Sequence, residues 1–149
     1  AAIWHWDVYY QAAIETAMTC GGAENFVTEM GGNAYYAGLS EGFVDASTLN
    51  ELVAAPGTAA AMEAVRELID SGEWDVFSGV KLNITVDAEA GTAAVEQVDA
   101  PLMSDGYELK DGEVVEMANP EIVPAGGASV TDDVIKSGMN YNVAGVVEG

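Results

Sequence analysis

The spacing of apolar residues changes at Trp74 from the period of a helix to the period of a strand, and this change constrains the fold most. Before Trp74, apolar residues recur every three or four positions in two stretches, residues 7–20 and 56–72. After it, short extended runs alternate with turn dipeptides. The resulting order of elements (helix, strand, helix, strands and a final helix) predicts a mixed α/β or α+β architecture.

The first stretch predicts a helix from Asp7 to Cys20, with Asp7 as the N-cap and Gly21-Gly22 as the stop. Its expected apolar face falls at i, i+3, i+4, i+7 and i+8: Tyr10, Ala13, Ile14, Ala17 and Met18. Cys20 is the only cysteine, so an internal disulfide is excluded. We expect Cys20 to act as a small apolar residue near the helix end.

The second stretch predicts a helix between Pro56, at the first helical position, and Gly72, just past the end. Its expected buried stripe consists of Met62, Val65, Leu68 and Ile69. Arg66 and Asp70 have the spacing of an i,i+4 ion pair, which contributes about 0.3–0.5 kcal/mol in a surface helix.

Turn dipeptides organise the strand-rich part of the chain. Asp105-Gly106 and Asp111-Gly112 are hairpin-type turns on either side of Tyr107–Lys110. Strands are expected at residues 34–37, 42–45, 76–77, 82–86 and 95–98. A short helix is expected to begin at Thr131, capped by the threonine hydroxyl.

The charge balance excludes several classes of partner. Twenty-five acidic residues face four basic ones, for a net charge of -21. Nucleic-acid binding requires clustered Lys and Arg to neutralise phosphates, and an anionic membrane surface would repel this chain. We interpret the acidity as an adaptation to solubility and salt. No Asp/Asn/Gly run matches a calcium-binding loop, so we expect no metal ligand set.

Residues suited to catalysis are scarce. The one His and the one Cys are separated by fifteen positions, with a predicted helix between them, so a Cys–His nucleophile pair is not expected. No phosphate-binding loop ending in Gly-Lys-Ser/Thr occurs. The abundant carboxylates carry no specificity. We therefore expect neither an enzyme nor a bound cofactor.

The segment Ile3–Tyr10 combines four large aromatic residues with one carboxylate, where a strand-like start meets the first helix. Aromatic faces can stack on a planar base or a sugar ring, and a carboxylate can accept two hydroxyl hydrogen bonds. This chemistry suits a nucleoside or a sugar. The alternative is that Trp4, Trp6, Tyr9 and Tyr10 pack a core or a hinge, with Asp7 acting only as the helix cap.

Five segments in order also resemble one known family. They are residues 3–10, 35–45, 59–79, 123–126 and 139–149, and the fourth reads Val123-Pro124-Ala125-Gly126. Together they are similar to the C-terminal portion of the basic-membrane-protein (BMP, PnrA-like) family of solute-binding lipoproteins. The resemblance implies part of a type I periplasmic-binding-protein-like α/β fold. Residues 1–81 would form an α/β segment with an interlobe crossing, 82–119 a β-rich insertion, and 120–149 a closing segment with a short helix.

The resemblance also implies a function. The family suggests a periplasmic or extracellular receptor, anchored to the membrane through the parent lipoprotein, that passes a nucleoside-like or other small polar ligand to an ABC permease. The ligand would sit between two lobes, so a second chain or an N-terminal portion would complete the fold. The first residues include neither an initiator Met nor the basic start of a signal peptide, and we expect a processed or trimmed chain.

The ligand-binding residues implied by the resemblance are Trp4, Trp6, Asp7, Tyr9 and Ser40. Asp7 aligns with a ribose-contacting Asp of nucleoside binders, whereas Ser40 stands where those proteins have a Lys. The negative field of the chain disfavours a phosphorylated ligand. A competing interpretation is an acidic extracellular structural or assembly subunit without a small-molecule ligand, whose Leu82–Asn119 region pairs with neighbours through exposed strand edges.

Overall fold

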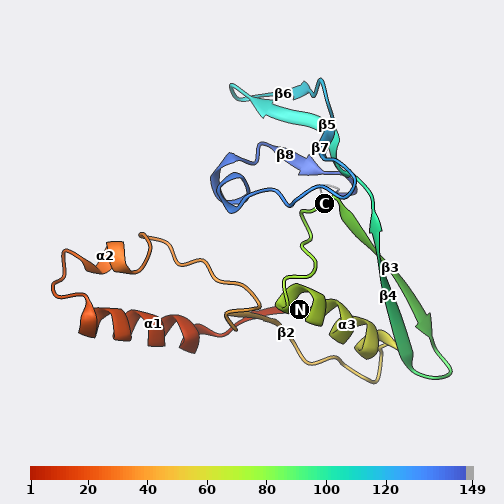
Figure 1. Ribbon diagram of the computed structural model, residues 1–149, viewed down its shortest axis with the longest axis horizontal. Coiled ribbons are helices and arrows are strands. Elements are labelled where there is room, and N and C mark those ends of the chain that lie inside the picture. The colour runs from red at the N-terminus through yellow and green to blue at the C-terminus, as the bar shows by residue number, and fades with distance from the viewer. Residues whose placement is uncertain (147–149) are drawn as a thin grey trace. The chain divides into compact units, whose positions relative to one another are not determined.

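The computed structural model describes residues 1–146 and divides the chain into two compact units (Figure 1). Unit 1 comprises Ala1–Ala54 with Ile69–Ser71, and unit 2 comprises Ala55–Leu68 with the chain from Gly72 onward. Helices and small antiparallel sheets make up the structure, so the predicted mixed α/β class is confirmed. Residues 147–149, which end the fifth segment of the family resemblance, lie outside the described residues.

Unit 1 is built on a two-stranded sheet and two helices. Strand β1 (Ala2–Trp4) pairs antiparallel with β2 (Val44–Ala46). Helix α1 (Trp6–Thr19) follows β1 directly, and the short helix α2 (Phe26–Glu29) packs against it. The sheet therefore brings the start of α1 beside a segment of chain almost forty residues further on.

The start of α1 differs from the prediction, because His5 and not Asp7 occupies the N-cap position. The backbone N–H of His5 still donates to the carbonyl oxygen of Phe43 over 2.8 Å, so the chain turns into the helix immediately after this sheet contact. Asp7 lies in the first turn, where a carboxylate faces the positive end of the helix dipole. The helix ends as predicted, with Cys20 at the C-cap and Gly21 at φ 75°.

The predicted apolar face of α1 is not buried in unit 1. Tyr10, Ile14 and Met18 are 58%, 61% and 81% exposed. The half-buried side of the helix is instead centred on the smaller residues Val8 and Ala12. Packing against the chain around α2, rather than hydrophobic periodicity, decides which side is covered.

Unit 2 contains a long hairpin and a four-stranded sheet. The hairpin joins β3 (Val80–Asp87) to β4 (Thr92–Asp99), which include the predicted strands 82–86 and 95–98. In the sheet, β5 (Leu102–Lys110) pairs with β6 (Glu113–Glu116), β7 (Glu121–Val123) and β8 (Tyr141–Val143), each antiparallel. Helix α3 (Thr58–Asp70) precedes the hairpin.

One of the two predicted hairpin turns is confirmed and the other is wrong. Asp111-Gly112 joins β5 to β6 as a two-residue turn, with φ 52° and 85°, the positive values that a type I′ turn requires. Asp105-Gly106 lies inside β5, because that strand continues through it while pairing with β7 and β8.

Other predicted elements shift or disappear. Residues 34–37 and 76–77 are not strands, and the strand expected at 42–45 is β2, which starts at Val44. α3 begins two residues after Pro56, and its expected buried stripe is only half covered, with Met62 38% exposed. The final helix is a π-helical turn, Val134–Gly138, whose N-cap is Asp133 and not Thr131. Thr131 contributes its carbonyl oxygen, which accepts from the N–H groups of Val134 and Ile135, in place of the predicted hydroxyl cap.

The buried hydrophobic side chains among residues 1–146 are few. In unit 1 the buried hydrophobic side chain is Phe43. In unit 2 they are Leu102 and Val123, which are paired across β5 and β7, and Ser104 is a buried polar residue of the same sheet. Within the same residues, no helix is long and apolar enough to cross a membrane.

Candidate ligand site in the aromatic cluster

Six aromatic rings of unit 1 form a connected set, which we call the aromatic cluster: Trp4, Trp6, Tyr9, Tyr10, Tyr35 and Phe43. The ring of Trp6 lies 5.8 Å from Trp4 and 5.7 Å from Phe43, centroid to centroid, with edge-to-face geometry in both pairs. Tyr9 lies 5.2 Å from Tyr35 and Tyr35 lies 5.2 Å from Phe43, again edge to face. Edge-to-face pairs at these distances contribute about 0.5–1.5 kcal/mol each beyond the burial of area.

Backbone pairing assembles the cluster. Trp4 closes β1, and Trp6 opens α1 one residue after the hydrogen bond between the His5 N–H and the Phe43 carbonyl oxygen. That bond fixes Phe43 beside Trp6 although the two residues are far apart in the chain. The side chain of His5 also approaches β2, because its Nε2 lies 3.8 Å from Asp45 Oδ2.

The turn before Phe43 carries Ser40. The N–H groups of Phe43 and Val44 donate to the carbonyl oxygen of Gly38 over 3.1 and 3.2 Å, and the Gly38 N–H donates to Glu41 Oε2 over 2.7 Å. These bonds close the turn around Ser40, whose side chain is exposed. Ser40 is therefore close in sequence to the centre of the cluster and available to solvent.

One side of the cluster faces solvent. Trp4 is 62% exposed, Trp6 50% and Tyr10 58%, while Phe43 at the centre is 9% exposed. Large aromatic side chains are usually mostly buried, so a group of half-exposed rings marks a surface suited to covering by another molecule.

The other side of the cluster borders a cavity of about 230 Å³ between α1, α2 and the chain that follows α2. Its lining is largely apolar and aromatic: Tyr9, Phe26, Val27, Met30, Gly32, Asn33, Ala34 and Tyr35. Sites for drug-sized ligands usually measure about 300–1,000 Å³, so this cavity suits one ring and not a whole nucleoside. The Asn33 amide, like the hydroxyls of Tyr9 and Tyr35, can both donate and accept hydrogen bonds at a ring edge.

The structure brings together part of the site expected from the sequence. Trp4, Trp6 and Tyr9 belong to the aromatic cluster, and Tyr9 also lines the cavity. Asp7 is exposed in the first turn of α1, and Ser40 is exposed in its own turn; neither lines the cavity.

Sequence reasoning missed the partners contributed by later parts of the chain. Tyr35 and Phe43 hold the cluster together, and Phe26 and Asn33 line the cavity. The sequence feature that points to them is the concentration of Gly and aromatic residues between Met30 and Asp45. It indicates a loop with aromatic side chains but does not identify the residues that they contact.

No family model, curated protein or solved structure matches this chain. Across residues 1–146, no group of three or more His, Cys, Asp or Glu side chains is placed to hold a metal ion. The cluster offers aryl faces and tyrosine hydroxyls, the cavity adds the Asn33 amide, and the Asp7 carboxylate lies on the same helix as Tyr9.

Proposed function

We propose that this chain binds a small, neutral, ring-containing ligand through the aromatic cluster, as part of a nucleoside-type solute-binding receptor. The observation that carries the proposal is the joining of half-exposed Trp4 and Trp6 to the cavity-lining Tyr9 in one set of ring contacts. A planar base can stack on such rings, and the cavity has room for one ring.

Polar groups near the rings suit the rest of a nucleoside. The Asp7 carboxylate lies one residue after Trp6 and is exposed, so it can accept hydrogen bonds from two neighbouring hydroxyls. Ser40 supplies a hydroxyl from the turn before Phe43. The net charge of -21 disfavours a phosphorylated ligand, because the field of the chain repels phosphate.

The five-segment resemblance to the BMP family supports the proposal that the chain is part of a solute-binding receptor. In that setting the chain belongs to a periplasmic or extracellular receptor, anchored through its parent lipoprotein, that delivers its ligand to an ABC permease. A second lobe, from another chain or from a preceding portion of the same protein, covers the exposed side of the cluster. Closure of two lobes over a ligand is a common mode of solute capture.

Calorimetric titration tests the proposal directly. Adenosine, guanosine, inosine and uridine are titrated into the protein, with AMP and ribose as comparison ligands. We expect saturable binding of at least one nucleoside and weaker binding of AMP. Ligand that binds only the folded protein also raises the unfolding midpoint, so thermal shift gives an independent readout.

Variants locate the binding. Tyr9→Ala removes a ring shared by the cluster and the cavity, and Asp7→Asn removes the charge while keeping the shape. Glu15→Gln is the matched control, because it removes one exposed carboxylate from the same helix α1. We expect Tyr9→Ala and Asp7→Asn to weaken nucleoside binding and Glu15→Gln to leave it unchanged. Equal affinities in all four proteins, or no nucleoside binding at all, would contradict the proposal.

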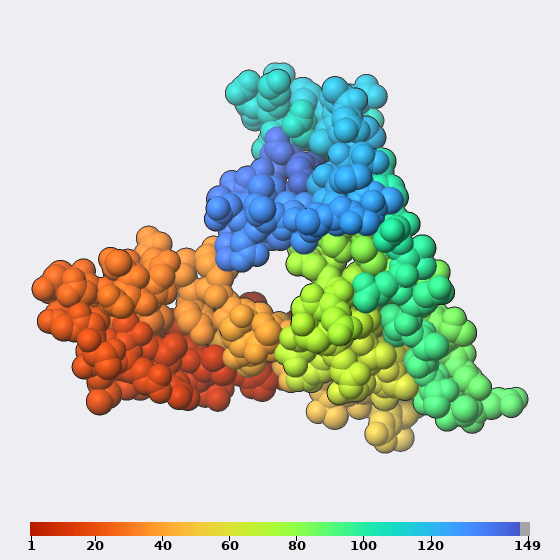
Figure 2. All heavy atoms as spheres, in the orientation of Figure 1, coloured from red at the N-terminus to blue at the C-terminus, as the bar shows by residue number. Residues whose placement is uncertain are grey.

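A second candidate function, an assembly subunit, is favoured by the hairpin of unit 2. Strands β3 and β4 form a two-stranded sheet of eight residue pairs, so each is an edge strand along its outer side. Figure 2 shows the green tip of this hairpin extending away from the other strands of unit 2. Long exposed edges can pair with another chain. Concentration-dependent assembly in sedimentation velocity, without any stabilisation by small molecules, would favour this function over ligand capture.

A further inference from the structure

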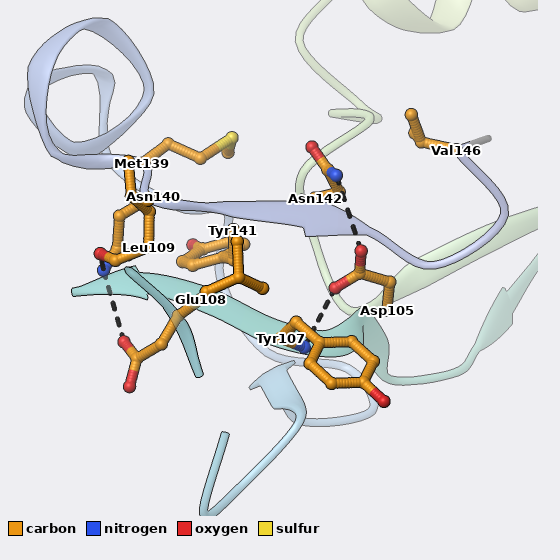
Figure 3. A pocket seen from close by; sticks show the side chains of 10 residues that line it. Asp105, Tyr107, Glu108, Leu109, Met139, Asn140, Tyr141, Asn142 and Val146 are labelled. Atoms are coloured by element: carbon orange, nitrogen blue, oxygen red, sulfur yellow. Dashed lines mark hydrogen bonds between the residues drawn. The ribbon is translucent and has the colours of Figure 1, made fainter. Parts of the chain in front are cut away.

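A second cavity lies in unit 2, beside the antiparallel pair of strands β5 and β8 (Figure 3). It has a volume of about 640 Å³ and is open to solvent. This volume falls within the roughly 300–1,000 Å³ of small-molecule sites. Its lining comes from β5, β6, β8 and the residues beside β8, so it is distinct from the aromatic cluster of unit 1.

An irregularity in β5 shapes this cavity. Ser104 faces Val143 and Glu108 faces Tyr141, so β5 carries the three residues 105–107 where β8 carries Asn142 alone. Bulges of this kind redirect side chains and are common beside binding sites. The extra residues make Asp105, Tyr107 and Glu108 all available to the same cavity.

Hydrogen bonds hold the bulge in place. Gly106 has φ 95°, a value that favours glycine, and its N–H donates to the hydroxyl oxygen of Ser104 over 3.1 Å. The N–H of Tyr107 donates to Asp105 Oδ1 over 3.0 Å. The buried Ser104 and the exposed Asp105 therefore fix the backbone that presents Tyr107.

Two amide–carboxylate pairs form the polar wall, as the dashed lines in Figure 3 show. Asn140 Nδ2 donates to Glu108 Oε2 over 3.2 Å and also to the carbonyl oxygen of Leu109 over 3.0 Å. Asn142 Nδ2 donates to Asp105 Oδ2 over 3.4 Å. Each carboxylate has about four lone-pair sites, so both pairs retain acceptors for further hydrogen bonds. The wall therefore favours a ligand that donates several of them.

The lining also includes exposed apolar and aromatic side chains. Tyr107 is 53% exposed, Leu109 54% and Val114 73%, and all three line the cavity. Exposed side chains of this size gain free energy when a ring with an apolar face covers them. A flat aromatic ring beside hydrogen-bond acceptors is an arrangement that suits a pyranose, whose ring has an apolar face and hydroxyls around its edge.

We propose that this cavity binds a neutral sugar ring, stacked on Tyr107 and held by hydroxyl hydrogen bonds to Asp105 and Glu108. Anionic sugars are disfavoured by the two carboxylates and by the net charge of the chain. The amides of Asn140 and Asn142 donate to those carboxylates, which reduces the number of side-chain orientations that a ligand would have to fix. This inference does not depend on the nucleoside proposal, because the two sites share no residue.

Titration of the ¹⁵N-labelled full chain with glucose, galactose, mannose and maltose, followed by NMR, tests the inference on the unaltered protein. We expect saturable shifts of the backbone amides of residues 105–109 and 140–142 with at least one sugar. Tyr107→Ala should weaken that binding by about two- to tenfold, the range expected for loss of one aromatic contact. Asp105→Asn keeps the side-chain shape and should also weaken it, because the ligand loses a charged acceptor.

Two control variants separate this site from its surroundings and from the aromatic cluster. Glu113→Gln removes a carboxylate from β6 that does not line the cavity, and Tyr9→Ala alters the cluster of unit 1. Both should keep sugar affinity within the error of the titration. The sugar inference is overturned by absent shifts up to about 50 mM sugar or by affinities equal in Tyr107→Ala and the parent. If the protein binds a sugar and no nucleoside, the result contradicts the proposed function and leaves the sugar inference intact.

Discussion

The backbone N–H of Gly126 donates a hydrogen bond to the carbonyl oxygen of Gly79 over 2.7 Å, and the N–H of Gly79 donates to the carbonyl oxygen of Gly127 over 3.0 Å. The same Gly79 carbonyl accepts from the N–H of Ala100 over 3.0 Å. Residues 59–79 and 123–126 are two of the segments of the family resemblance, and here they meet in space. Gly79 therefore joins the start of the hairpin to the chain that follows β7.

Gly79→Ala should destabilise unit 2, because a Cβ at this position would collide with the backbone of Pro124 and lie 2.7 Å from the nitrogen of Gly127. Backbone atoms cannot move aside as the end of a side chain can, so we expect a loss of about 1–3 kcal/mol. Urea unfolding followed by circular dichroism measures it. Gly138→Ala is the control, since its new Cβ would have no contact closer than 3.9 Å. Equal losses in the two variants would contradict the role of Gly79.

Gly112→Ala should weaken the β5–β6 hairpin by about 1–2 kcal/mol, the cost of a left-handed conformation for a residue with a Cβ. Gly112 has φ 85° and Asp111 has φ 52° in the two-residue turn. Asp111→Asn should be nearly neutral, because Asn tolerates that conformation well. Urea midpoints of the two variants, compared with the parent, give the measurement. An Asp111→Asn protein as unstable as Gly112→Ala would mean that the turn is not of this type.

Phe43→Ala should destabilise unit 1 by about 3 kcal/mol, since large core residues cost this much when truncated. Phe43 is the buried ring of the aromatic cluster, whereas Met18 is 81% exposed on α1. Met18→Ala should change stability by less than about 0.5 kcal/mol. Tryptophan fluorescence in a Trp74→Phe background reports on Trp4 and Trp6, which both belong to unit 1. A large loss in Met18→Ala would show that the exposed face of α1 is covered.

Ser104→Ala should destabilise the β5 bulge by about 1 kcal/mol, the net contribution of one hydrogen bond. Ser104 is 5% exposed, and its hydroxyl oxygen accepts from the Gly106 N–H. Hydrogen exchange at the Gly106 amide should accelerate in this variant. Ser137→Ala removes an exposed hydroxyl that donates to the Asp133 carbonyl oxygen, and serves as the control. Unchanged exchange at Gly106 would contradict the bond.

Added NaCl should raise the unfolding midpoint of the whole chain. Twenty-five acidic residues against four basic ones repel one another more in the compact state than in the unfolded chain. The screening length falls from about 30 Å at 0.01 M salt to about 3 Å at 1 M, so the stabilisation should be steepest at low salt and level off. A thermal scan across this range measures it. A midpoint that is flat at low salt and rises only at high salt would indicate ion exclusion instead of screening.

Local chemistry made some elements predictable. Asp111-Gly112 needs only its own two residues to favour a type I′ turn, and Gly21 needs only its missing side chain to end α1. Asp105-Gly106 has the same composition as Asp111-Gly112 and yet lies within a strand, because β7 and β8 pair with β5 on either side of it. The composition of the dipeptide does not reveal which strands will pair with the chain on either side of it.

The sequence by itself determined the two long helices, α1 and α3, to within about two residues, the positions of strands β3 and β4, and the acidic character of the chain. Only the tertiary structure decided that Tyr35 and Phe43 lie against Tyr9 and Trp6, and that Asn140 and Asn142 hold Glu108 and Asp105. Helices and turns depend on the φ/ψ preferences of a few neighbouring residues. Contacts between residues far apart in the chain depend instead on which strands pair and in which register, and apolar periodicity leaves that choice open.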